Sequence, residues 1–260
     1  MTDFTFLQTQ IIGNVLVVTI SREAKLNAMN SLLMQELTAC FRSVHDSLDV
    51  RAVVLTGKGK AFMAGADIEE YNGLDAGQFF AFQDRGREMY RSIENCAKPV
   101  VAAVNGYALG GGFELALACD LIVASTKAKF GLPEVNLGLV PGGGGLQKVS
   151  RLFGPYIAKE LAMTGRFLTA NEGKEWGLVN RVAEPEELLN ATMALAQELA
   201  QKAPLAVQVL KKLINEGRDA SLETAQAYDR AFLANLFRTE DAQEGITAFV
   251  EKREARFIGK

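Results

Sequence analysis

Residues 98–125 read KPVVAAVNGYALGGGFELALACDLIVAS, and this stretch decides the fold. An apolar run at residues 99–104 predicts a buried strand, and the glycines of residues 105–112 predict a tight turn after it. A short helix is expected over residues 113–119 and a further strand over residues 121–124. Short apolar strands that alternate with helices are typical of an α/β protein, in which helices cover a sheet.

The segments before this stretch continue the alternation. We interpret the first twenty residues as two strands, one around Phe4 and Phe6 and the other the β-branched run at residues 15–20. A helix capped by Asn30 is expected next, because apolar residues recur at helical spacing after it. The remaining elements expected in this half are a strand at residues 51–56 and a polar-rich helix at about residues 78–95.

The last third of the chain has a different pattern. From about residue 186 to residue 250, apolar residues recur at i, i+3 or i+4, and i+7, which predicts successive helices punctuated by Pro204 and Gly217. We therefore divide the chain into an α/β core, residues 1–200, and a helical C-terminal region, residues 201–260. Such a region is commonly a lid or an oligomer interface, and the simplest alternative is more of the same domain. These helices carry more apolar positions than a small core needs, which favours an interface between copies.

Composition excludes several classes of protein. The 260 residues are 48% hydrophobic and 23% charged, as in an ordinary globular protein. A net charge of −3 and a pI near 5.5 argue against a general nucleic-acid or membrane-surface binder. No apolar run reaches the roughly 18 residues of a membrane span, and the N-terminal sequence does not resemble a signal peptide. The three widely spaced cysteines, Cys40, Cys96 and Cys119, fit reduced thiols, so we expect a cytoplasmic protein.

The histidine count restricts the chemistry further. His45 is the single histidine, so a multi-histidine metal site cannot be built and we expect no metal. A Ser-His-Asp triad would need this residue, but its place beside an apolar helical stripe favours a half-exposed structural histidine near a helix end. Catalysis would then come from carboxylates, backbone amides or a bound cofactor.

Glycines cluster in one part of the sequence. The segment from Gly106 to Gly145 contains ten of them, which marks backbone that makes tight turns or approaches a ligand closely. PGGGGLQK is not a phosphate-binding P-loop, because Leu146 and Gln147 separate Gly145 from Lys148. A helix that begins at the glycines before Glu114 would direct free N–H groups into the turn, where Gly111 lets an oxyanion approach its amide.

Two glutamates lie in apolar surroundings. Glu114 precedes Leu117, Ala118 and Leu121 on one helical face, and a buried carboxylate there is costly unless it is used. Glu134 follows a proline within an equally apolar segment. A helix-start glutamate favoured by the dipole and an exposed loop glutamate are the alternatives. Two carboxylates in apolar settings are what a general acid and base near neutral pH require, although spacing does not show that they converge.

Several motifs together resemble one known family. The run KPVVAAVNGYALGGGFELALACDLIVAS and the later AKFGLPEVNLGLVPGGGG are similar to the enoyl-CoA hydratase/isomerase (crotonase) superfamily. GKAFMAGADIEE resembles its first oxyanion-hole segment, NEGKEWGLVNRV its later helix–strand marker and EDAQEGITAFVEKREARFIGK its closing segment. The resemblance covers about residues 12–260.

This resemblance implies an architecture and a partner. The fold would be a crotonase-like spiral of ββα units followed by a helical C-terminal trimerisation region, in a homotrimer or a homohexamer. The substrate would be an acyl-CoA thioester, with no cofactor besides the coenzyme A that forms part of it, and with no nucleic-acid or membrane partner.

The resemblance also assigns roles to residues. The oxyanion-hole amides would be those of Ala66 and Gly111, and the catalytic pair would be Glu114 and Glu134. Substrate contacts fall on Lys25, Ala28, Ala64, Ala66, Asp67, Ile68, Gly111 and Gly142. The lysines expected to meet the phosphates of coenzyme A are Lys25, Lys58, Lys60 and the partner subunit's Lys252.

A pair of glutamates is typical of the hydratases of this family. We therefore expect an enoyl-CoA hydratase of fatty-acid β-oxidation, a hydro-lyase that adds water reversibly to a 2-trans-enoyl-CoA to give a 3-hydroxyacyl-CoA. The alternatives are isomerisation of a 3-enoyl-CoA to a 2-enoyl-CoA and a non-catalytic acyl-CoA-binding homologue. Leu146 and Lys148 depart from the family's usual Thr and Arg, and Phe113 is bulkier than its usual residue. These departures bear on acyl-chain length and leave the reaction class unchanged.

Overall fold

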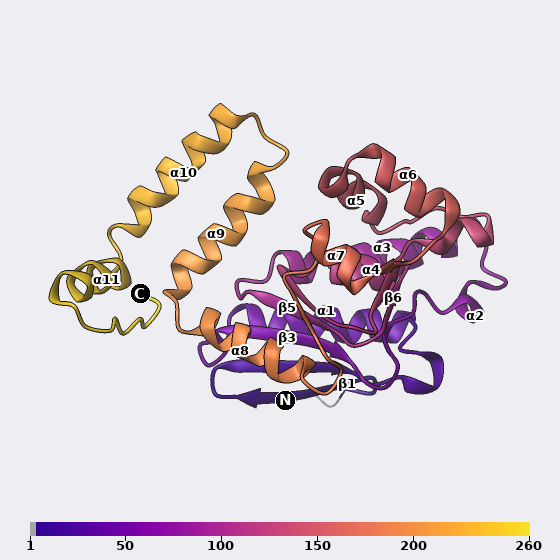
Figure 1. Cartoon of the computed structure of the whole chain (residues 1–260), viewed down its shortest axis with the longest axis horizontal. Coiled ribbons are helices and arrows are strands. Elements are labelled where there is room, and N and C mark those ends of the chain that lie inside the picture. The colour runs from indigo at the N-terminus through magenta and orange to yellow at the C-terminus, as the bar shows by residue number, and fades with distance from the viewer. Residues whose placement is uncertain (1–3) are drawn as a thin grey trace.

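The fold is built on two sheets whose strands alternate along the chain (Figure 1). It is seen in a computed structural model that describes residues 4–260. The larger sheet has the order β1-β2-β3-β5-β7-β10, in which β1 and β2 form an antiparallel hairpin and the other neighbours are parallel. Its strands are β1 Leu7–Ile12, β2 Val15–Ile20, β3 Ala52–Gly57, β5 Val100–Val104, β7 Leu121–Ser125 and β10 Arg181–Ala183.

The smaller sheet has the order β4-β6-β8-β9, and its first three strands are parallel. These strands are β4 Ala61–Met63, β6 Tyr107–Leu109, β8 Lys129–Gly131 and β9 Leu168–Thr169. Each of β3, β5 and β7 is followed by one strand of the smaller sheet and then by helical structure, so three successive ββα turns form a spiral. The expected α/β fold with a spiral of ββα units is confirmed.

Helices cover both faces of the larger sheet. In β2, Val15 and Val17 face α8, while Leu16 and Val18 belong to the opposite cluster with α1 and α3, as the period of two along a strand requires. The helices of this half are α1 Ser31–His45, α2 Ile68–Tyr71, α3 Ala76–Glu94 and α4 Gly111–Ala116, with the 3₁₀ turn η1 Glu23–Lys25. Those that follow are η2 Pro133–Leu137, α5 Gly145–Phe153, α6 Pro155–Thr164, α7 Ala170–Glu175 and α8 Leu188–Ala200.

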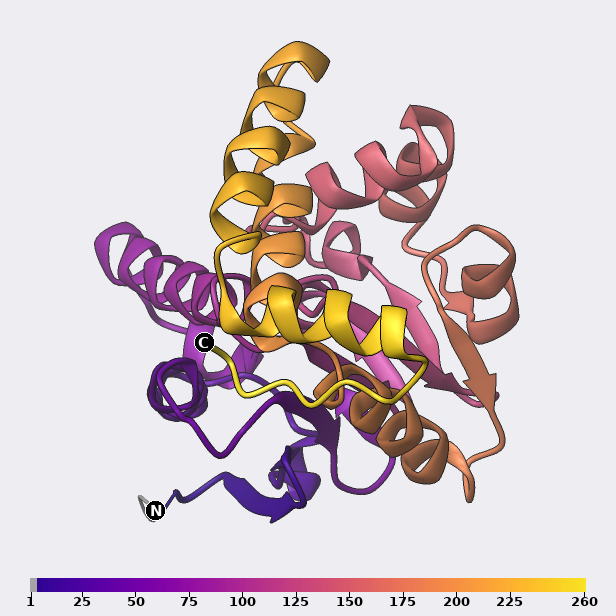
Figure 2. The same cartoon turned by 90° about the vertical axis from the view of Figure 1, so that its left-hand side faces the viewer.

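Three helices end the chain: α9 Pro204–Gly217, α10 Leu222–Leu236 and α11 Glu240–Glu251. α9 and α10 lie side by side and extend away from the sheets, and Figure 2 shows the terminal segment running back along α11. Asp241 fixes this return, since its carboxylate accepts the amides of Ile258 and Gly259 at 2.7 and 2.8 Å. No helix within residues 4–260 is long and apolar enough to cross a membrane.

Most expected elements form where the pattern placed them, and the exceptions have physical causes. Asn30 caps α1 by accepting the amide of Leu33 at 2.9 Å, as predicted. The first strand begins only at Leu7, beyond Phe4 and Phe6, and its pairing with β2 decides where it starts. The predicted turn at residues 105–112 contains β6, because this short segment pairs with β4 and β8, which are distant in sequence.

Candidate active site

The loops that follow β4, β6 and β8 meet at one end of the smaller sheet. Because these strands are parallel, their carboxyl ends lie at the same edge. Ala66 follows β4, Gly111 and Glu114 follow β6, and Glu134 follows β8. All four residues line one cavity of about 150 Å³, which is closed on another side by α3. The spiral therefore brings one component of the predicted site from each of its three turns.

Glu114 is held in place by the glycine-rich loop before α5. The side chain is buried, and its Oε1 accepts the amides of Gly143 and Gly145, each at 2.8 Å. Neither glycine has room for a side chain: a Cβ at Gly143 would lie 2.6 Å from Glu114 Oε2. Burial raises the pKa of Glu114, while the two amides and Lys148 oppose that rise by favouring the charged form. Oε2 is left as the oxygen without an amide donor.

Glu134 has a contrasting environment. It lies in the first turn of η2, and its Oε2 is buried without a hydrogen-bond partner among the described residues. Burial raises the pKa of Glu134 to about 7, against the opposing effect of its own backbone amide, and the charge of Glu114 adds to the rise. Two amides therefore favour the charged form of Glu114 against the effect of burial, whereas Glu134 binds its proton with a pKa of about 7. Such a pair suits a base and an acid.

Two backbone amides face the same cavity. Ala66 is bracketed by hydrogen bonds to Met29, from the Met29 amide to Gly65 O and from the Asp67 amide to Met29 O, each 2.8 Å. In a parallel bridge of this kind the N–H of the bracketed residue points the other way. Gly111 is the first residue of α4, where an amide has no intrahelical acceptor. In the described part of the chain neither amide donates a hydrogen bond to another residue, which suits an oxyanion site.

Other predicted substrate contacts divide into two groups. The residues that line the cavity besides those above are Ala64, Ile68 and Gly142. Lys25, Ala28 and Asp67 do not line it. Asp67 caps α2 and pairs with Arg22 at 2.6 Å, and the same Arg22 donates to the carbonyl of Ala28 at 2.9 Å. Their part in substrate binding stays a prediction.

Two of the lysines expected to meet coenzyme A have carboxylate neighbours. Lys25 pairs with Glu69 at 2.5 Å, and Lys58 pairs with Glu23 at 3.2 Å. Both pairs are largely exposed, so they are weak and a phosphate could exchange with the carboxylate.

Sequence reasoning missed the aromatic wall of the cavity. Tyr90 of α3 is buried beside Gly111, and Tyr71 makes edge-to-face contacts with Phe79 and Phe82 at 5.2 and 5.0 Å between ring centroids. Their helical spacing was visible, but spacing alone indicates a core face and does not show which core residues border a cavity.

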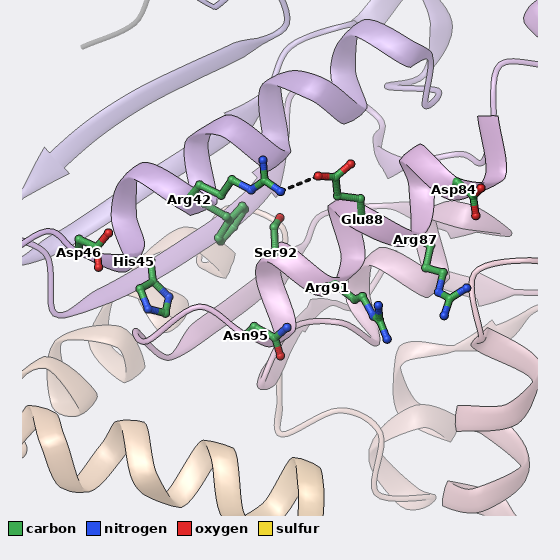
Figure 3. Close-up of a pocket in the computed structure, with 10 residues that line it drawn as sticks. Arg42, His45, Asp46, Asp84, Arg87, Glu88, Arg91, Ser92 and Asn95 are labelled. Carbon is green, nitrogen blue, oxygen red and sulfur yellow. Dashed lines mark hydrogen bonds and ion pairs between the residues drawn. The ribbon is translucent and has the colours of Figure 1, made fainter. Parts of the chain in front are cut away.

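A larger, open pocket of about 700 Å³ lies between α1 and α3 (Figure 3). Most of its side chains are charged, with both signs present, and Arg42 forms an ion pair with Glu88 at 2.5 Å. His45 ends α1, and its Nδ1 accepts the amide of Ala97 at 3.2 Å, which is a structural role. This pocket contains no buried carboxylate, so the smaller cavity is the candidate active site.

Comparison with known proteins agrees with this geometry. The chain matches the family model for enoyl-CoA hydratase/isomerase over residues 10–260, and it belongs to that family. It is 44% identical to the short-chain-enoyl-CoA hydratase of Clostridium acetobutylicum over 93% of each chain, and 43% identical to the crotonyl-CoA hydratase of Syntrophomonas wolfei over 94% of each. The crystal structure of enoyl-CoA hydratase from Bacillus anthracis superposes with a TM-score of 0.95 at 36% identity, covering 98% of this chain and 100% of that one. The predicted family is confirmed.

Proposed function

We infer that the protein is an enoyl-CoA hydratase, a hydro-lyase that adds water reversibly to a 2-trans-enoyl-CoA to give a 3-hydroxyacyl-CoA. The observation that carries this inference is a pair of carboxyls on one cavity with two free amides: two backbone amides favour the charged form of Glu114, and Glu134 has a pKa of about 7. The relatives named as hydratases, at 43–44% identity over most of the chain, support the same reaction.

In this mechanism the amides of Ala66 and Gly111 receive the thioester oxygen. Negative charge grows on that oxygen as water adds to Cβ, so donors aimed at it stabilise the transition state more than the substrate. Each such donor contributes about 3–4 kcal/mol in comparable oxyanion sites. Glycine at position 111 suits the role, because a side chain there would meet Met29 and Tyr90, each 3.0 Å from an added Cβ.

The two glutamates then divide the proton transfers. Glu114 Oε2 takes a proton from water while the oxygen of that water attacks Cβ. Glu134 gives its own proton to Cα. The net result is addition of H and OH across the double bond, and the exchange of the two carboxyl protons with solvent restores the starting state. Coenzyme A takes part as a portion of the substrate, and the chemistry draws on carboxylates and backbone amides.

The experiment that tests this function is the hydration of crotonyl-CoA and of longer 2-enoyl-CoAs. It is followed by the loss of the enoyl thioester absorbance, with the double variant Glu114→Gln/Glu134→Gln as the control for uncatalysed hydration. A protein that only isomerises 3-enoyl-CoA, or that binds thioesters without turnover, would contradict the assignment.

We also propose that copies of the chain assemble as a homotrimer or homohexamer through residues 201–260. α9, α10 and α11 leave large apolar side chains in the open, which a lone chain would expose to water. They include Leu210, Ile214, Leu233, Phe237, Phe249 and Val250. Light scattering should give three or six times 28.2 kDa, and a monomer at micromolar concentration would contradict the proposal.

Two further expectations accompany the assembly. Lys25, Lys58, Lys60 and the partner subunit's Lys252 would bind the phosphates of coenzyme A, so affinity for coenzyme A should fall as salt is added.

A cytoplasmic location is proposed from the thiols: Cys40, Cys96 and Cys119 are free, and burial raises the pKa of Cys40 to about 12, which makes that thiol unreactive.

A further inference from the structure

Tyr90 lies between two parts of the proposed site. It extends from α3 and is 4% exposed. Its hydroxyl donates to the carbonyl oxygen of Gly111 at 3.0 Å, and it lies 3.8 Å from the sulfur of Met29. Gly111, whose N–H is the proposed oxyanion donor, is therefore held at its carbonyl group by Tyr90 of α3.

The same side chain borders the proposed base. An added Cβ at Gly143 would lie 2.3 Å from Tyr90 Cε2 and 2.6 Å from Glu114 Oε2, so the ring edge and the carboxylate oxygen both lie against this glycine. Because the amides of Gly143 and Gly145 occupy Oε1, the oxygen beside Tyr90 is the one left for water. Burial and the charge of Glu114 raise the pKa of Tyr90, so its hydroxyl stays protonated and remains a donor.

We propose that Tyr90 is a positioning residue for hydration: its hydroxyl holds the carbonyl of Gly111 and its ring edge borders the side of the Gly143 backbone where Glu114 Oε2 lies, so that the oxyanion amide and the basic oxygen keep a fixed relation. The proposal rests on the proposed function. Gly111 has no side chain of its own to restrict its backbone, and an anchor from α3 limits how far its peptide groups can rotate. Water attack at Cβ and charge growth on the thioester oxygen must occur together, so an error in either position slows the same step.

The test is Tyr90→Phe, which keeps the ring and removes the hydroxyl. We expect kcat for crotonyl-CoA to fall about tenfold, the effect of about one hydrogen bond in the transition state, while KM changes less than about twofold. Tyr156→Phe, which removes the hydroxyl of an 85% exposed residue on α6, is the matched control and should behave as the wild type.

Gly111→Ala perturbs the same contact from the other side, since its added Cβ would lie 3.0 Å from Tyr90 Oη. It should lower kcat in the same direction, and a parental kcat in this variant would count against the contact if Tyr90→Phe proves unstable in thermal unfolding. The two changes combined should cost less than the sum of the single effects, because they share the contact between Tyr90 and Gly111, while the added Cβ also meets Met29. Parental kcat in either folded variant would overturn the proposal. Failure of the wild type to hydrate crotonyl-CoA would instead overturn the proposed function.

Discussion

Replacing Glu134 by glutamine should stabilise the fold above neutral pH while removing activity. The folded protein raises the pKa of Glu134 from 4.5 to about 7, so the native state binds this proton more tightly than the unfolded chain does. A raised pKa contributes stability below pH 4.5 that is lost as the pH rises towards 7. Glutamine carries no charge at any pH, so the Glu134→Gln variant escapes this loss.

The size of the effect follows from the same pKa. A shift of one pKa unit corresponds to about 1.4 kcal/mol, so the rise to about 7 corresponds to about 3 kcal/mol. Glu134 is only part-buried, and solvent screening reduces the expected gain at pH 8 to about 1–2 kcal/mol. For a chain of this size that is an increase in Tm of about 3–6 °C.

The assay is thermal or urea unfolding, followed by circular dichroism at pH 5 and at pH 8 and at one protein concentration. The difference between Glu134→Gln and the wild type should be small at pH 5 and should grow at pH 8. Glu175→Gln, which changes an exposed glutamate on α7, is the control and should show no such dependence. An equal difference at both pH values would show that Glu134 does not hold its proton, and the reasoning from burial would be refuted.

Three further predictions concern catalysis. Glu114→Gln should lower crotonyl-CoA hydration by about 10³-fold or more but spare some isomerisation of 3-enoyl-CoA, because one carboxyl can perform that reaction. Glu134→Gln should lose both activities. Parental hydration by Glu114→Gln would contradict the two-carboxyl mechanism. The wild-type kcat should fall as the pH rises through about 7, because the proposed acid Glu134 loses its proton; a profile flat to pH 9 would argue against this role. Gly143→Ala should lower kcat about 100-fold, since its Cβ would lie 2.6 Å from Glu114 Oε2, whereas Gly217→Ala, whose Cβ would lie 3.5 Å from that of Ala225, should be unaffected.

Local patterns in the sequence predicted most of the framework. The β-branched run of β2, the Asn30 cap of α1 and the helical spacing of α9 and α10 depend on residues a few positions apart, so a linear pattern contains them. The oxyanion segments and the two glutamates were identified by family resemblance, and their apolar neighbours already indicated unusual carboxyls. The start of β1 and the presence of β6 could not be read in this way, since each depends on its partner strand.

The sequence by itself determined the α/β class and the family, and it predicted Glu114 and Glu134 as the catalytic pair. Only the tertiary structure decided that they share a cavity, because parallel pairing of β4, β6 and β8 brings to one edge loops that are far apart along the chain. It also decided their different chemistry: two amides stabilise Glu114, while Glu134 has a buried oxygen without a partner. The role proposed for Tyr90 likewise came from the tertiary structure, because its burial and its hydrogen bond to Gly111 depend on residues that meet in space.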